Sequence, residues 1–235
     1  STEDTHGKNV AVGFRALKNQ NAGADAFNVA IGHSAGSNIQ TGAENVIIGG
    51  LAGDNLNTGS DNVVIGYQAL SAEDNHGKNV AIGYYALKDQ NAGADAYNVA
   101  IGYNVGQAIT TGIRNTLVGS LAGDALSTGT RNTAIGYGAL GSEDDHGYNT
   151  AVGHNALSAL DAGADGYNTA VGADAGGTMT TGIQNTIIGG LAGDALTDGA
   201  KNVAIGYQAL SAEDGHGRNV AVGFQALRAQ NAGSD

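Results

Sequence analysis

A five-residue pattern, Asn-(Val/Thr)-aliphatic-(Ile/Val)-Gly, recurs thirteen times along this chain of 235 residues. The first interval between copies is nineteen residues and the next three are seventeen; this series then repeats, so that four copies make a super-repeat of seventy residues. A fixed short period is typical of solenoids, in which each repeat forms one coil and neighbouring coils bury a core together. The pattern therefore predicts a single all-β domain over residues 1–235, a parallel β-solenoid (β-roll) of thirteen coils of seventeen or nineteen residues.

Each coil can be numbered from its Asn, which stands at position 1 of a short strand closed by a Gly corner at position 5. We expect the Asn side chains to stack as a ladder that joins each coil to the next, although a polar row could also serve as a ligand track. The ladder comprises Asn9, Asn28, Asn45, Asn62, Asn79, Asn98, Asn115, Asn132, Asn149, Asn168, Asn185, Asn202 and Asn219. The corner glycines are Gly13, Gly32, Gly49, Gly66, Gly83, Gly102, Gly119, Gly136, Gly153, Gly172, Gly189, Gly206 and Gly223.

The strand residues at positions 2 to 4 are apolar on both faces. Position 2 is Val or Thr, position 4 is Ile or Val, and position 3 is Ala nine times and otherwise Ile47, Val64, Leu117 or Ile187. Since side chains alternate along a strand, we place positions 2 and 4 inward and position 3 outward. We expect a second strand after the corner, with inner rows at positions 8 and 9. An apolar position 3 indicates that several chains pack side by side, unless the small Ala simply tolerates exposure.

Composition excludes several classes of function. A formal net charge of −12 with only ten Lys and Arg argues against nucleic acid as a partner. No Cys is present, which excludes disulfides and thiolate metal sites. No apolar run approaches the roughly 18 residues that span a bilayer, so we expect no membrane insertion in this segment. The chain starts and stops in mid-coil, and we expect it to be a segment of a longer array.

The strongest candidate for metal chemistry is a Glu-Asp-x-His-Gly loop that recurs once in every super-repeat. Carboxylates suit hard cations and imidazole suits zinc-like ions. However, copies about 19 Å apart, at four coils of about 4.8 Å, cannot share an ion. We therefore predict capped, solvated turns, with no metal and no cofactor. The loops contain Glu3, Asp4 and His6; Glu73, Asp74 and His76; Glu143, Asp144 and His146; and Glu213, Asp214 and His216.

No nucleophile and base stand in a catalytic pattern, so we predict no catalytic residues and no enzyme activity. A polysaccharide-acting β-helix enzyme is the remaining enzymatic alternative.

Ice binding is an alternative from another class, because regular solenoids can present flat ranks of Thr. Five consecutive coils carry Thr at position 2, but that rank is placed inward here and reverts to Val elsewhere. A second rank at position 14 is interrupted by Asp198. The first rank contains Thr116, Thr133, Thr150, Thr169 and Thr186.

Aromatic residues recur at position 6 and before the ladder Asn, as at Tyr84 and Tyr97. Aromatic rings can stack on sugars, but they can also cover strand edges or seal lateral contacts. We favour packing over ligand contact.

The unit seen in residues 79–87, Asn-Val-Ala-Ile-Gly-Tyr-Tyr-Ala-Leu, and again in residues 202–210, resembles the head repeats of trimeric autotransporter adhesins of the Yersinia type. It also resembles the repetitive shafts of some phage tail fibres. The resemblance implies a left-handed β-roll, a homotrimer, a location outside the cell or on a virion, and attachment to matrix proteins or glycans. We therefore expect a structural and adhesive fibre segment that associates with itself.

Overall fold

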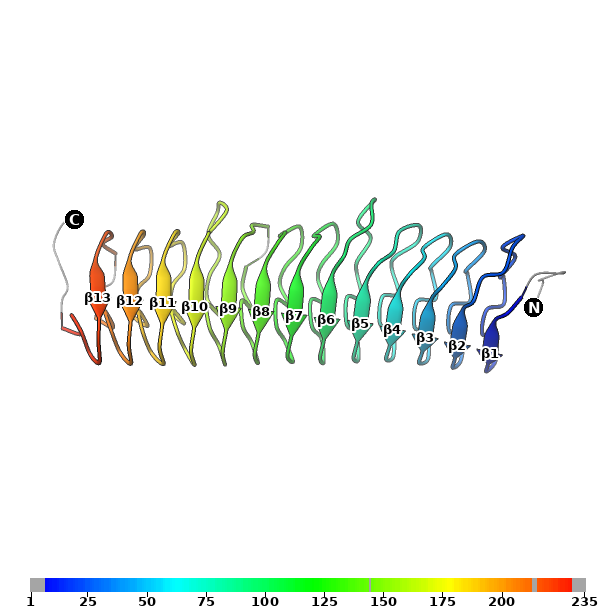
Figure 1. The fold of residues 1–235 in the computed structure, drawn as a ribbon, viewed down its shortest axis with the longest axis horizontal. Helices are drawn as coiled ribbons and strands as arrows, with labels where there is room; N and C mark the ends of the chain where they lie inside the picture. Colours follow the sequence, from blue (N-terminus) through cyan, green and yellow to red (C-terminus); the bar gives the residue numbers. More distant parts are fainter. Residues whose placement is uncertain (1–6, 144, 213–214, 230–235) are drawn as a thin grey trace. The chain divides into compact units, whose positions relative to one another are not determined.

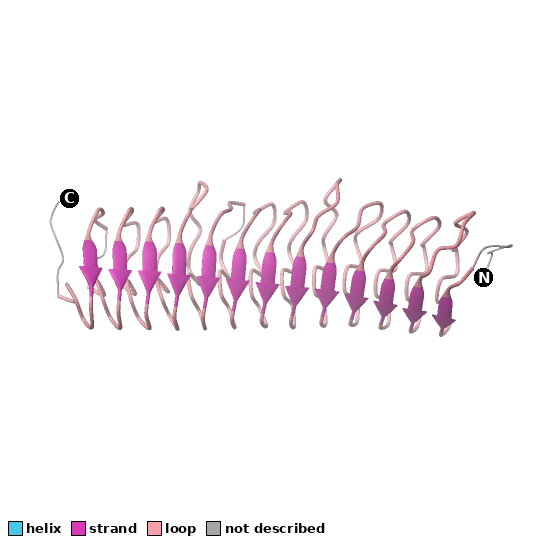
Figure 2. Ribbon diagram, viewed as in Figure 1, coloured by secondary structure: helices cyan, strands magenta, loops and turns pink. Residues whose placement is uncertain are grey.

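The computed structural model describes residues 7–143, 145–212 and 215–229. The chain forms two compact units, Ser1–Asn115 and Thr116–Asp235, which are described separately below. Within the described ranges the regular secondary structure consists of three-residue strands alone, joined by turns and loops (Figure 2). The prediction of a single domain stays a prediction.

The first unit contains six strands in one parallel sheet, in which each strand pairs with its neighbours in sequence (Figure 1). Val10 pairs with Val29, Val29 with Val46, and Val80 with Val99, so the register follows the spacing of the pattern in the sequence. The strands are β1 (Val10–Val12), β2 (Val29–Ile31), β3 (Val46–Ile48), β4 (Val63–Ile65), β5 (Val80–Ile82) and β6 (Val99–Ile101).

The second unit repeats this arrangement with seven parallel strands. Thr116 pairs with Thr133, Thr150 with Thr169, and Val203 with Val220. The strands are β7 (Thr116–Val118), β8 (Thr133–Ile135), β9 (Thr150–Val152), β10 (Thr169–Val171), β11 (Thr186–Ile188), β12 (Val203–Ile205) and β13 (Val220–Val222). Both units are parallel β-solenoids whose coils have the lengths expected from the sequence, so the predicted fold class is confirmed. The left-handed sense stays a prediction from the resemblance.

The predicted facing of the strands is wrong. Position 3 points into the core, where Ala30, Ile47 and Val64 are fully buried, and positions 2 and 4 face outward. Ile31 at position 4, for example, is 38% exposed. A three-residue strand offers one face with a single side chain and one with two, and the narrow core of the coil takes the single one.

The rest of the core comes from positions 8, 9 and 12, and it is filled by complementary sizes. Where position 9 is Gly, larger side chains occupy the space. A Cβ at Gly36 would lie 2.9 Å from Ile39 Cδ1 and 3.0 Å from Ile47 Cδ1. A Cβ at Gly123 would lie 3.0 Å from Leu117 Cδ2. This packing explains why large residues at position 3 are accommodated inside.

The second strand predicted after the corner is absent from the described residues. That segment is a series of turns in which positions 7 and 9 have positive φ, including Leu17 at 47° and Leu87 at 48°. The turns still bond between coils, since Leu17 N donates to Ala35 O at 3.0 Å and Gly36 N donates to Ala52 O at 3.0 Å. The two inner rows predicted at positions 8 and 9 are confirmed, because Ala35, Leu70 and their equivalents are buried in every coil before the last described one.

Candidate functional site

The ladder asparagines join consecutive coils through their side-chain oxygens. Within each unit the Oδ1 of a ladder Asn accepts the backbone N–H of the Asn one coil further on, with N···O distances of 2.7 Å from Asn28 to Asn9, 3.0 Å from Asn62 to Asn45 and 3.2 Å from Asn98 to Asn79. In the second unit the corresponding distance from Asn202 to Asn185 is 2.8 Å. The backbone amide that would otherwise lack an acceptor is thereby satisfied.

Most of the described ladder amides also donate, with Asn149 Nδ2 as a buried exception. Asn28 Nδ2 donates to Gly42 O at 2.8 Å, and Asn45 Nδ2 donates to Gly59 O at 2.9 Å. Both side chains are buried, as are most others in the row. Buried amides with their donors used inside the protein cannot contact a ligand, so this geometry favours the structural role over the ligand track.

The corner glycines close each strand with a backbone that only glycine adopts easily. Their φ values lie on the positive side, at 136° for Gly66 and 140° for Gly83. The corners of adjacent coils also approach closely, since a Cβ on Gly66 would overlap the carbonyl oxygen of Gly83. Conformation and space therefore both require glycine at this position.

The Glu-Asp-x-His-Gly loops place their Glu inside the coil. Glu73 and Glu143 stand at position 12, which in other coils holds core residues such as Ile39 and Leu56, and both are fully buried. Glu73 Oε1 accepts the backbone N–H of His76 at 3.1 Å, and Glu143 does the same for His146. The prediction of a capped turn is confirmed for these two loops, but the Glu of the cap is not solvated. The other two copies lie partly or wholly outside the described residues.

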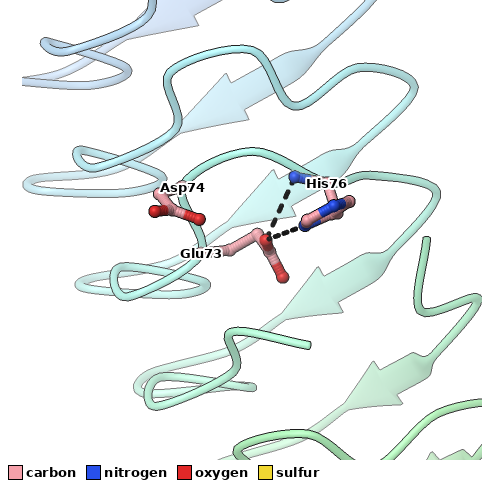
Figure 3. A group of neighbouring side chains, drawn as sticks. All are labelled: Glu73, Asp74 and His76. Carbon is pink, nitrogen blue, oxygen red and sulfur yellow. Dashed lines mark hydrogen bonds and ion pairs between the residues drawn. The ribbon is translucent and has the colours of Figure 1, made fainter. Parts of the chain in front are cut away.

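The buried carboxyls have altered acidity. Burial raises the pKa of the Glu73 carboxyl above its usual value, against the opposing effect of the hydrogen bond from the His76 N–H. Burial likewise raises the pKa of Glu143, whose oxygens accept the N–H groups of Ala162 and His146. The imidazole of each loop lies beside the carboxylate, with His76 Nδ1 3.7 Å from Glu73 Oε1 (Figure 3).

Among the described residues, two groups of possible metal ligands lie at these loops. Glu73 and His76 lie near Asp74 of the same loop, whereas Glu143 and His146 lie near Asp161 of the next coil. Asp144, the counterpart of Asp74, lies outside the described residues. Figure 3 shows Glu73 pointing toward His76, with Asp74 on the opposite side of Glu73. Because the Glu already caps the turn through Oε1, the geometry favours a structural role.

In each unit the outward strand residues lie side by side on one surface, which we name the β-branched strip. In the first unit it contains Val or Ile only, at positions 2 and 4 of β1 to β6, as in Val63 and Ile65. In the second unit, position 2 of β7 to β11 is Thr, as in Thr150, and position 4 remains Val or Ile. These side chains are half-buried to exposed, so the first unit presents an apolar surface two side chains wide, and the second unit pairs an apolar row at position 4 with a row of mostly Thr at position 2. Contiguous apolar surfaces of this kind mark interaction sites.

The aromatic side chains at position 6 stack on one another along the coils. The ring centroids of Tyr67 and Tyr84 are 5.6 Å apart, and those of Tyr84 and Tyr103 are 5.4 Å apart with an interplanar angle of 11°. Stacking covers the faces of the rings and leaves their edges to solvent. Since sugars stack on ring faces, this arrangement favours packing over ligand contact.

Comparison of the chain with family models, with curated proteins and with solved structures gives no match. The described residues contain no helix of the length and hydropathy needed to cross a membrane.

Proposed function

We propose that this chain is a non-enzymatic segment of a structural and adhesive fibre, which associates laterally with copies of itself and serves attachment or spacing at a cell or virion surface. The observation that carries the proposal is the β-branched strip, which repeats on every coil. The resemblance to trimeric adhesin heads and phage fibre shafts supports the same function and favours three chains.

A second copy of this chain is the partner that fits the strip best. Its side chains repeat with the coil, at steps of about 4.8 Å. A partner can match that surface over many coils only if its own surface repeats with the same step. Covering β-branched side chains removes apolar area from water at about 25 cal/mol per Å², and the contribution accumulates with every coil.

The test introduces charge into the strip. The double variant I65E/I82E places two carboxylates on the outward side of β4 and β5, where burial against another chain would leave them without partners. The control A24E/A94E adds the same charge at two exposed loop positions. Light scattering after gel filtration should give an oligomer for wild type and for the control, and a monomer for I65E/I82E. A wild-type monomer, or an I65E/I82E oligomer, would contradict the proposal.

Ice binding is the second candidate, and one observation favours it. Thr116, Thr133 and Thr150, with the two that follow, face outward rather than inward, so the main reason for setting this function aside is wrong. Each Thr lies beside a Val or Ile on a regular sheet. Thermal hysteresis by a monomeric wild-type chain, lost in T133L/T150L, would favour ice binding over the fibre.

Enzyme activity is not part of the proposal. A panel of polysaccharides incubated with the chain should remain intact by reducing-end assay. Cleavage above the level of a buffer control would replace the proposal with the polysaccharide-acting alternative.

A further inference from the structure

The first unit contains a groove of about 430 Å³ that follows consecutive coils. Two rows of side chains line it, at positions 11 and 13 of the coil, and six of the eight lining residues carry carboxamides. Ala72 and Asp74 are the other two. The carboxamides are Asn19, Asn38 and Asn55 in the first row, and Gln40, Asn57 and Asn91 in the second.

The repeat itself shows that the coil does not require these amides. One super-repeat further on, Asn38 and Asn55 are replaced by Ala108 and Ala125, and Gln40 and Asn57 by Thr110 and Ser127, in coils of the same fold. The third super-repeat has Thr178, Ala195, Thr180 and Thr197 at the same places. The ladder Asn and the corner Gly, by contrast, stand in every coil. The amides of the groove are therefore a local feature that the architecture leaves free to vary.

The first row holds its amides in fixed orientations. Asn19 Nδ2 donates to Asn38 Oδ1 at 3.1 Å, Asn38 Nδ2 donates to Asn55 Oδ1 at 3.3 Å, and Asn55 Nδ2 donates to Ser71 O at 2.8 Å. A carboxamide has two N–H donors and an acceptor with two lone pairs, so each of these contacts leaves further hydrogen-bonding capacity. The row thus presents ordered donors and acceptors without the entropic cost of fixing them on binding.

The second row provides an unsatisfied acceptor. Asn57 Oδ1 is buried and accepts no hydrogen bond from the described protein residues. A carbonyl oxygen without a donor is unfavourable, and rotation of the Asn57 amide toward the groove would bring this oxygen to a hydroxyl group of a bound ligand.

Charge selects the class of ligand. Asp74 is the one ionisable residue that lines the groove, and no cation lies among the lining residues. A groove with this lining does not attract anions. Its alternating donors and acceptors match a ligand rich in hydroxyl groups, and their repetition over five coils, about 19 Å, matches a chain of sugars rather than a single one.

We propose that the amide-lined groove of the first unit binds a neutral oligosaccharide, aligned along the coils. The inference gives a ligand class to the attachment role proposed above and rests on that role. Lateral association is measured independently through the β-branched strip, so failure of either proposal can be recognised without the other. A glycosidase is not implied, because hydrolysis ordinarily needs two carboxyl groups and the groove has one.

The experiment is calorimetric titration of the full chain with cellohexaose, mannohexaose and chitohexaose, in EDTA and again with Ca²⁺. The quadruple variant N38A/Q40T/N55A/N57S gives the groove the residues found at 108, 110, 125 and 127, so the fold is expected to tolerate it. The control T178A/T197S alters the equivalent positions of the second unit. Circular dichroism melting checks that both variants are folded.

We expect at least one neutral hexasaccharide to bind wild type and the control with equal affinity, with and without Ca²⁺. Its affinity for the quadruple variant should be lower by a factor of at least about ten. Three results would overturn the proposal: no binding of any of these sugars to wild type, equal binding to the quadruple variant, or binding of Ca²⁺ alone that the quadruple variant loses. The last result would indicate that the amide oxygens form a cation site.

Discussion

Removing one ladder amide should destabilise the first unit far more than removing an exposed amide. In Asn62→Ala the protein loses the acceptor for the backbone N–H of Asn79, at 3.0 Å, and two contacts donated by Nδ2, to Asn45 Oδ1 at 3.0 Å and to Ser60 O at 3.2 Å. Asn45 Oδ1 keeps a donor, because Asn62 N still reaches it at 3.0 Å. The Asn79 N–H is left buried without a partner.

The magnitude follows from these contacts. A buried donor without an acceptor costs about 1–3 kcal/mol, and each lost neutral hydrogen bond costs about 1 kcal/mol, partly offset because the polar amide is no longer buried. We therefore expect Asn62→Ala to lower the free energy of unfolding by about 2–4 kcal/mol.

The assay is urea denaturation followed by circular dichroism, with Asn38→Ala as the matched control. Asn38 is exposed, and its counterpart in the next super-repeat is already Ala108, so we expect a change of about 0.5 kcal/mol or less. If Asn62→Ala unfolds within about 0.5 kcal/mol of Asn38→Ala, the structural account of the ladder is refuted.

Three further predictions concern the corners, the buried carboxyls and the strip. Gly66→Ala should lower the free energy of unfolding by about 3 kcal/mol or more, because its φ is 136° and the new Cβ would meet Gly83 O. Gly93→Ala, with φ of 69° and open space around its Cβ position, should cost about 1–2 kcal/mol, and equal losses in urea denaturation would contradict the close approach of the corners. The raised pKa of Glu73 and Glu143 means that the folded state favours the protonated carboxyls, so their contribution to stability is lost as pH rises from the ordinary Glu value of 4.5 through the folded pKa. The melting temperature of E73Q/E143Q should therefore increase relative to that of wild type as pH rises from 4 to 7. A difference in melting temperature that does not change with pH would contradict the raised pKa of these carboxyls. Ile65→Cys, the only thiol of its chain, should form a disulfide between chains under mild oxidation on a non-reducing gel, whereas Val64→Cys should not, and equal dimer from both would contradict the outward placement of Ile65.

The coil register could be predicted from the sequence because spacing alone determines it. The Asn of the pattern provides a buried acceptor for a backbone N–H, and the Gly adopts a positive φ. Both requirements repeat with the coil. Any residue that performs the same backbone task in every coil is visible in one sequence.

The facing of the strand could not be predicted from side-chain character, because all three strand residues are apolar. A signal was nevertheless present. Ile47, Leu117 and Ile187 at position 3 occur in coils with Gly at position 9, which is the exchange of volume expected between two residues of one core. Position 9 also carried a signal for the turn that follows the corner. Leu in some coils is replaced by Gly in others, as at Leu17 and Gly36, and both residues have positive φ.

The amide groove could not be predicted from the residues that repeat in every coil, because its carboxamides are residues that differ between super-repeats. Asn38 and Asn57 are informative only when they are compared with Ala108 and Ser127 of the next super-repeat. In a repeat protein the shared residues describe the coil, and departures from the repeat indicate where a local function has been added.

The most direct test of the β-branched strip as an interface between copies is sedimentation equilibrium of the wild-type chain at micromolar concentrations. We predict the mass of an oligomer of 23.3 kDa chains, with three chains as the number implied by the resemblance to adhesin heads. A mass of 23.3 kDa throughout the concentration range would contradict lateral self-association.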